Sequence, residues 1–263
     1  SKKNSSMACG LRLLSEGEGD AFISAGNSGA LVMGATFIVK RIKGIKRCAF
    51  APVIPKDKGC FMLIDCGANV ECRPEMLKQF GVMGSVYMES VMGVKKPRVG
   101  LINVGVEEHK GGEFQHEAYQ RLKDSDLNFI GNVEARDILG DAVDVVVTDG
   151  FTGNIMLKMY EGVAKTLMGK FKNILTKNIT NKIAAAVLMK DIKDLKKETD
   201  YNEYGGAPIM GIRKPVFKAH GNSKAQTIKS AIKLTINYVN SNVTETIQKK
   251  IESQGDSSEI KNN

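Results

Sequence analysis

The chain reads Phe61-Met62-Leu63-Ile64-Asp65-Cys66-Gly67-Ala68-Asn69 at residues 61–69, where a short apolar run passes directly into a polar loop. The run predicts a strand. A helix from Pro74 to about residue 92 follows it, and proline suits the first turn of a helix. Strand, loop and helix in this order are the unit of a parallel sheet with crossover helices.

The same order recurs elsewhere in the chain. Further apolar runs, each followed by a loop rich in Gly, Asn or Asp, occupy residues 21–24, 99–104, 128–130, 143–147 and 216–219. Apolar strands are typical of a sheet covered on both faces, so we predict an α/β fold with three layers, α/β/α, around a mostly parallel sheet. Ligands of such sheets bind beyond the carboxyl ends of the strands, and we expect the loops to meet there in one cleft. For any single loop, a tight turn without a ligand is the alternative.

The composition indicates one large domain, or two closely packed ones, because 42% of the 263 residues are hydrophobic and only 6 are Pro. The 5 cysteines contain no CxxC pair, which argues against a disulfide framework or a zinc site and fits a reducing cytoplasm. No signal segment opens the chain, and no apolar run approaches the ~20 residues that cross a bilayer. We therefore expect a cytoplasmic protein.

The charge balance predicts attraction to anions. The formal net charge is +9 and the pI is about 9.2, which suits phosphate, an acidic carrier protein or an anionic lipid surface. No nucleic acid is expected as a partner, since Trp is absent, aromatic residues make up 6% and no nucleic-acid-binding motif occurs. Excess lysine on a solvated surface explains the charge equally well.

The segment from Ile174 to Lys197 differs in character from the rest of the chain. It has apolar residues at helical spacing, namely Leu175, Ile179 and Ile183. Lysines follow them, beginning with Lys190 and Lys193. The pattern predicts an amphipathic hairpin that rests on a lipid surface or packs against a second subunit, and burial in the core of the same chain is an equal alternative. We divide the chain into a main α/β catalytic region (1–172), this protruding segment (173–204) and a return strand with one closing helix and a frayed tail (205–263).

Eight motifs connect the chain to a known family. In order they are SAGNSGA (24–30), DCGAN (65–69), QFGVMGS (79–85), PRVGLINVG (97–105), KGGE (110–113), NFIGNVE (128–134), DGFTGN (149–154) and EYGGAP (203–208). Taken together, they resemble the bacterial phosphate acyltransferases of phospholipid synthesis, also called acyl-carrier-protein:phosphate transacylases. One motif alone is weak evidence, whereas eight in family order, from about residue 2 to residue 232, are specific.

The resemblance implies a function and a fold. The function is transfer of a long-chain acyl group from acyl carrier protein to inorganic phosphate, giving acyl phosphate. The implied fold is similar to that of phosphotransacetylases and the isocitrate dehydrogenase superfamily, in a homodimer that contacts membranes peripherally. The family usually begins with a further β/α portion, which we expect to supply a strand and part of the cleft, and it more often has Asn where Gly112 stands here.

Attack of phosphate on a thioester requires a bound phosphate, a polarised carbonyl and a thiolate leaving group. Backbone N–H groups at the start of a helix bind anions, which suits Asn27, Ser28 and Gly29, although these residues equally suit a helix cap. Lys110, beside Gly111 in a glycine-rich loop, is expected to neutralise phosphate or the developing oxyanion. A solvated surface lysine is the alternative.

Two carboxylates and several amides complete the predicted site. Asp65 and Asp149 each end an apolar strand, where a carboxylate is costly unless it has partners; either one orients Lys110 or accepts a proton, or both cap loops. Asparagine amides can donate hydrogen bonds to the carbonyl oxygen or to phosphate. We predict Lys110, Asp149 and Asn154 as catalytic, with no metal and no cofactor. The predicted binding residues are Asn27, Ser28, Gly29, Asp65, Asn69, Gly111, Asn132 and His220.

The sequence leaves other functions open. A phosphotransacylase that uses acyl-CoA is the nearest alternative, and a non-catalytic membrane-associated scaffold that recruits lipid enzymes is another. A dehydrogenase is disfavoured because no GxGxxG follows a first strand. A covalent acyl-cysteine route through Cys66 is disfavoured because no His or Asn pattern marks an activated thiolate.

Overall fold

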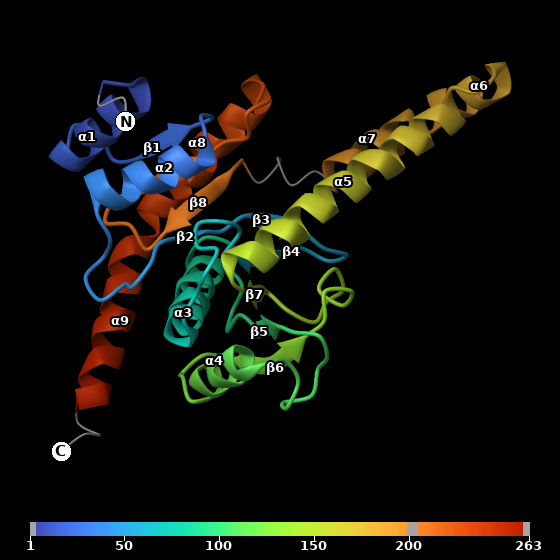
Figure 1. Ribbon diagram of the computed structural model, residues 1–263. Coiled ribbons are helices and arrows are strands. Elements are labelled where there is room, and N and C mark those ends of the chain that lie inside the picture. The colour runs from blue at the N-terminus through green and yellow to red at the C-terminus, as the bar shows by residue number, and fades with distance from the viewer. Residues whose placement is uncertain (1–3, 199–204, 260–263) are drawn as a thin grey trace.

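The computed structural model describes residues 4–198 and 205–259, whose strands form two sheets (Figure 1). One sheet has the order β1-β9-β8-β2 and the other the order β3-β4-β7-β5-β6. The strands are β1 (Phe22–Ser24), β2 (Ala49–Phe50), β3 (Val53–Pro55), β4 (Cys60–Ile64), β5 (Val99–Ile102), β6 (Phe129–Val133), β7 (Val145–Val147), β8 (Ala207–Met210) and β9 (Val216–Lys218).

The five-stranded sheet is built as the apolar runs predict. Strands β4, β7, β5 and β6 are parallel, and only β3 is antiparallel to its neighbour β4. Every residue of β4 and β7 is buried, as expected for strands covered on both faces. Helix α3 (Pro74–Ser90) packs against β4 and β7 and also contacts α4 (Glu113–Lys123).

The four-stranded sheet joins the two ends of the described chain. Strand β1 pairs in parallel with β9, while β8 is antiparallel to both β9 and β2. Helices α1 (Ser6–Glu16) and α2 (Ser28–Gly34), with the π-helix η1 (Ala35–Val39), bury Leu11 and Leu31 in a second hydrophobic core. The α/β class is confirmed, but its strands lie in two sheets, and the short strands β2, β3 and β8 were not predicted.

The closing helix is where the sequence-based prediction was wrong. The structure has two helices, α8 (Ala225–Asn240) and α9 (Val243–Glu259), and the backbone stays helical where a frayed tail from residue 253 was expected. The break falls at Asn242, whose φ of 49° is left-handed, a conformation that Asn tolerates better than most residues. After the break, Val243, Ile247 and Ile251 are buried, and α9 packs against α3.

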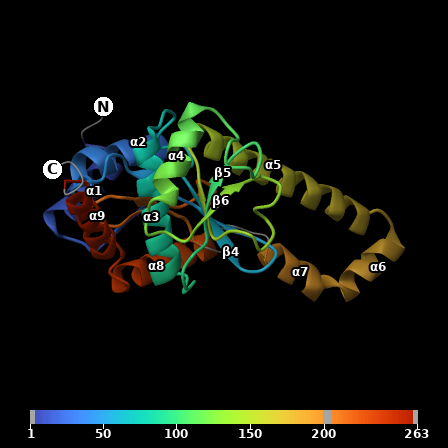
Figure 2. The same cartoon turned by 90° about the horizontal axis from the view of Figure 1, so that it is seen from below.

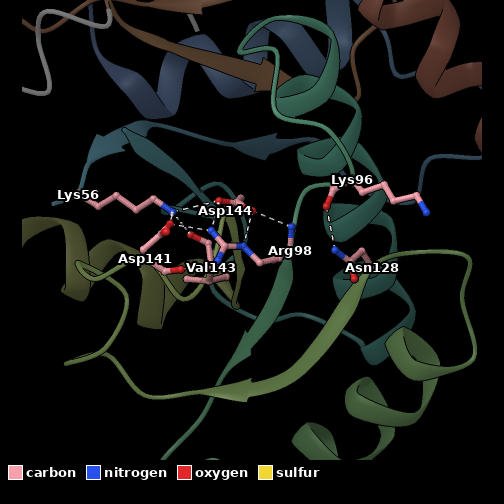
Figure 3. A network of polar contacts seen from close by, with 7 residues as sticks. All are labelled: Lys56, Lys96, Arg98, Asn128, Asp141, Val143 and Asp144. Carbon is pink, nitrogen blue, oxygen red and sulfur yellow. Dashed lines mark hydrogen bonds and ion pairs between the residues drawn. The ribbon is translucent and has the colours of Figure 1, made fainter. Parts of the chain in front are cut away.

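A charged network holds the amino ends of the central strands (Figure 3). Asp144 accepts hydrogen bonds from Arg98 Nε (2.9 Å) and from Lys56 Nζ (3.0 Å), and the Lys56 side chain is only 2% exposed. Burial alone would raise the pKa of Asp144, but the hydrogen bonds from Arg98 and Lys56 outweigh it and hold the pKa well below its usual range. Because Arg98 and Asp144 precede β5 and β7, this network lies at the opposite end of the strands from the predicted ligand loops.

Three helices form an arm that leaves the body of the protein (Figures 1 and 2). Helix α5 (Gly150–Leu175) extends far beyond the sheets, and α6 (Ile179–Val187) and α7 (Met189–Glu198) turn back from its end. No residue of α6 is buried, so burial of this segment in the core of the same chain is excluded. The side chains of residues 196–198 and all of residues 199–204 lie outside the described part, and the proposed domain boundaries stay a prediction.

Candidate active site between the two sheets

A cleft lies where the two sheets meet. Strands β2, β3, β8 and β9, helices α2 and α5 and the loop after β9 contribute to its walls. The lining residues are Ser28, Phe50, Pro52, Val53, Leu157, Lys158, Glu161, Gly206, Ala207, Lys218 and His220. Two of the predicted binding residues, Ser28 and His220, are therefore brought together although they lie near opposite ends of the chain.

Two cationic side chains line this cleft, one from a strand and one from a helix. Lys218 is on β9, and its ammonium group donates a hydrogen bond to the carbonyl oxygen of Ala219. Lys158 is on α5 and forms an ion pair of 2.8 Å with Glu161. Burial, and secondarily the positive charge of Lys158, lowers the pKa of Lys218. A cleft that gathers positive charge in this way favours an anionic ligand.

The loop before α2 is organised as a helix cap. Asn27 accepts a 2.9 Å hydrogen bond from the N–H of Ala30 through its side-chain oxygen, so one of the donors at this helix start is already satisfied. Ser28 and Gly29 are exposed in the first turn, and Ser28 reaches the cleft. On the facing loop, the N–H of Asn222 donates to Nδ1 of His220 at 3.2 Å.

Asp65 is buried, and its hydrogen bonds hold the loops beside the cleft together. Its side chain accepts hydrogen bonds from the N–H groups of Phe50 (2.8 Å), Ala68 (3.2 Å) and Asn69 (2.7 Å), and from the Asn69 side chain (3.0 Å). Burial raises the pKa of Asp65, while these hydrogen bonds act in the opposite direction. Since both carboxylate oxygens are engaged inside the protein, Asp65 supports the wall at Phe50 and does not line the cleft.

The start of α5 packs against the loop of Asp65. Asp149 caps α5 by accepting hydrogen bonds from Thr152 N (2.9 Å) and Thr152 Oγ1 (2.7 Å). A Cβ on Gly153 would collide with the carbonyl oxygen of Asp65, so only glycine permits this approach. The exposed Asn154 lies against Gly67, and α5 then carries Leu157, Lys158 and Glu161 along the cleft.

Lys110, Gly111 and Asn132 form a separate group. The Asn103 side chain donates to the carbonyl of Lys110 at 2.9 Å, and the Asn132 side chain donates to the carbonyl of Glu107 at 2.8 Å, which ties the loop after β5 to β6. Neither Lys110 nor Asn132 lines the cleft described above. The sheet order explains the separation, because β5 and β6 lie at the far side of the sheet from β3.

The predicted convergence of all loops is therefore met in part. Asp65, Asn69, Asp149 and Asn154 come together, and Ser28 and His220 share the neighbouring cleft. Sequence reasoning missed Lys158 and Lys218. A signal for each was present: Lys218 is the charged residue in an otherwise apolar strand directly before the His220 loop, and Lys158 lies one helical turn after Asn154.

The cysteine next to Asp65 is unsuited to covalent catalysis. Burial, followed by the negative charge of Asp65, raises the pKa of the Cys66 thiol well above its usual range. A thiol with a raised pKa forms little of the nucleophilic thiolate near neutral pH. The raised pKa therefore disfavours an acyl-cysteine intermediate at Cys66.

Comparison with solved structures identifies the class of fold. The chain is similar to the EutD phosphotransacetylase from Staphylococcus aureus, with a TM-score of 0.59 and 16% identity over 88% of this chain and 66% of that one. It is also similar to a branched-chain phosphotransacylase from Enterococcus faecalis V583, with a TM-score of 0.56 and 14% identity over 91% of this chain and 80% of that one. The fold is therefore phosphotransacetylase-like, as the motifs implied.

Sequence comparison then identifies the family. The fatty acid synthesis protein family matches residues 1–246, and the chain belongs to this family. A phosphate acyltransferase from Caldanaerobacter subterraneus subsp. tengcongensis is 52% identical over 255 residues, which cover 97% of this chain and 77% of the relative. A phosphate acyltransferase from Bacillus licheniformis is 50% identical over 256 residues, which cover 97% and 78%. The resemblance predicted from the eight motifs is confirmed.

Proposed function

We propose that this chain is an acyltransferase that moves an acyl group from a thioester to inorganic phosphate, in fatty acid and phospholipid synthesis. A phosphate oxygen attacks the thioester carbonyl, the new C–O bond forms, the C–S bond breaks, and the thiolate leaves and takes up a proton. The observation that carries the proposal is the cationic cleft between the sheets, in a chain about half identical to phosphate acyltransferases. Phosphate is substantially dianionic near neutral pH, so positioning provides much of the catalysis.

We propose long-chain acyl carrier protein as the acyl donor. Carrier proteins of this kind are acidic, and a chain with a net charge of +9 attracts them at long range. Acyl-CoA is the alternative donor. The test measures thiol release and acyl phosphate formation with matched acyl chains on either carrier, with and without phosphate. We expect phosphate-dependent release from acyl carrier protein; equal or faster release from acyl-CoA would overturn the choice of donor.

The residues predicted from the sequence keep distinct roles in this proposal. Asn154 is exposed beside Gly67, where its amide can donate to the thioester carbonyl, and Asp149 fixes the start of the helix that carries Asn154. Lys110 lies on a neighbouring loop at the same edge of the sheet, and it is proposed to neutralise charge on the reacting group.

A homodimer formed through α5 is also proposed. Large apolar side chains follow one another at four-residue spacing along α5 and stay exposed: Phe151, Ile155, Met159, Val163, Leu167 and Phe171. Ile155, Met159, Val163 and Leu167 also line an apolar cleft of about 560 Å³, whose other wall includes Phe61 and Ile138. Exposed apolar surface of this extent along a helix is typical of a protein–protein interface, and a second copy of α5 presents a matching surface.

Membrane contact is proposed for the end of the arm. Ile179, Ile183 and Val187 of α6 are exposed, and lysines such as Lys177 and Lys182 lie among them. Apolar residues flanked by lysine suit an interfacial helix on anionic lipid. Among the described helices, none has the length and hydropathy needed to cross a bilayer. Flotation with phosphatidylglycerol vesicles tests the contact, with Ile183→Asp expected to reduce binding and Leu13→Asp, an exposed apolar residue on α1, as the control.

The same experiment separates enzyme from scaffold. Vesicle binding together with phosphate-dependent acyl phosphate formation supports a peripheral enzyme. Vesicle binding by a protein that forms no acyl phosphate from either carrier would favour the scaffold. Absence of vesicle binding in the wild-type protein would remove the proposed membrane contact and leave the acyltransferase proposal unaffected.

A further inference from the structure

We infer that Lys158 and Lys218 hold one phosphate ion between them in the cleft, and so form the phosphate-binding pair of the acyl transfer. The inference rests on the proposed function for its reaction, but the binding site itself is defined by the cleft. The two lysines belong to different parts of the fold. Lys218 is on β9 of the four-stranded sheet, and Lys158 is on α5, which follows β7 of the five-stranded sheet. A bound anion would therefore bridge the two halves of the protein.

Lys218 is held by a rigid part of the fold. It lies opposite Ser24 of β1 on one side and Ala207 of β8 on the other, so its backbone is fixed by strands on both sides. The N–H of Ala219 also donates to the carbonyl of Ser24 at 3.0 Å. A side chain anchored in this way presents its ammonium group at a defined place on the cleft wall.

Gly206, which also lines the cleft, packs closely against the backbone of Lys218. Its φ is +131°, where residues with side chains are strained, and a Cβ there would lie 2.6 Å from the carbonyl oxygen of Lys218. Glycine at this position therefore lets the chain at the start of β8 lie directly against the backbone of β9 beside Lys218. The remaining charged or titratable groups that line the cleft are Glu161 and His220.

The positive charge of the two lysines favours binding of an anion in the cleft. Two ammonium groups that line one cleft repel each other, and burial with the charge of Lys158 lowers the pKa of Lys218. Glu161 partly offsets the charge of Lys158 through their 2.8 Å ion pair. A phosphate dianion between the lysines removes the repulsion and accepts charge-assisted hydrogen bonds from both. The bound phosphate is thereby placed beside Ser28 and His220, which line the same cleft.

The test measures binding of inorganic phosphate to the full chain by calorimetry, without an acyl donor. Lys218→Met and Lys158→Met should each weaken phosphate binding by about 10- to 100-fold, the range for one lost charged hydrogen bond. Lys218→Arg should keep most of the affinity. The matched control is Lys165→Met, an exposed lysine on α5 that does not line the cleft, which should bind phosphate as the wild type does.

Steady-state kinetics give a second readout. In Lys158→Met, the KM for phosphate should rise by a similar factor while the KM for the acyl donor stays unchanged. The Lys158 side chain is 61% exposed, so we expect Lys158→Met to fold. This variant therefore tests phosphate binding even if Lys218→Met does not fold. Phosphate affinity within twofold of wild type in Lys158→Met would overturn the inference.

The experiments distinguish failure of the proposed phosphate site at Lys158 and Lys218 from failure of the proposed acyl transfer. Loss of phosphate binding in the lysine variants of a protein that transfers no acyl group would support the pair and refute the proposed function. Normal acyl transfer with an unchanged phosphate KM in the same variants would refute the pair and leave the function standing.

Discussion

The backbone N–H of Phe50 donates a 2.8 Å hydrogen bond to Oδ1 of Asp65, which connects the two sheets. Phe50 ends β2 of the four-stranded sheet and lines the cleft, whereas Asp65 follows β4 of the five-stranded sheet. The Asn69 side chain extends the link by donating to both Asp65 (3.0 Å) and the carbonyl of Cys48 (2.7 Å). The relative position of the cleft walls therefore depends on a buried carboxylate that does not itself line the cleft.

Replacement of Asp65 by Asn should destabilise the protein. The amide NH₂ would face backbone N–H donors, so at least one buried donor would lose its acceptor, at a cost of about 2–4 kcal/mol in the free energy of unfolding. Urea unfolding measures the effect. Asp57→Asn, in the exposed turn between β3 and β4, is the control and should change little. A loss below about 0.5 kcal/mol in Asp65→Asn would show that the link is dispensable.

Replacement of Asp144 by Asn should make stability less dependent on acid pH. The folded pKa of Asp144 is depressed, so the ionised carboxylate stabilises the fold above its unfolded pKa of about 3.9, and this contribution is lost as the pH falls toward the folded pKa. At pH 7 the variant should lose about 3 kcal/mol, because Arg98 and the buried Lys56 lose their partner. Urea midpoints from pH 7 to pH 3 should show the difference shrinking below about pH 4. A difference that does not vary with pH would contradict the assignment.

Replacement of Lys110 by Ala should abolish acyl phosphate formation while the fold stays intact. Loss of one stabilising group at a developing oxyanion costs about 10²- to 10³-fold in kcat, and the Lys110 side chain is only partly buried and is not part of a hydrophobic core. Turnover and circular dichroism are measured together. Lys95→Ala, an exposed lysine before β5, serves as the control. Turnover at the wild-type rate would remove Lys110 from the catalytic group and leave the cleft as the whole site.

Replacement of Leu167 by Glu should convert the proposed homodimer into a monomer. Leu167 is 60% exposed in the single chain, and a carboxylate at this position would be desolvated against the apolar surface of a second copy. Light scattering after size exclusion should report half the wild-type mass. Lys165→Glu, on the opposite face of α5, should leave the mass unchanged. A wild-type protein that is already monomeric would refute the dimer.

The sequence by itself determined the fold class and the family. Apolar runs such as residues 61–64, each followed by a glycine-containing loop and a helix, are local signals, because burial on both faces requires every residue of a short strand to be apolar. The same local order predicted that Asp65, Asn69, Asp149 and Asn154 would come together, since the carboxyl ends of neighbouring parallel strands share one edge of the sheet.

Only the tertiary structure decided which side chains face one another across the cleft. Strands β2, β3 and β8 are two to four residues long, too short to show a period, and the antiparallel pairing of β2 with β8 joins residues as distant in the chain as Ala49 and Met210. The meeting of Lys158 with Lys218, and the inward turn of Asp65 toward Phe50, depend on those pairings. Local sequence carries the preference of each segment for helix or strand, whereas the contacts between segments arise only when the two cores are packed together.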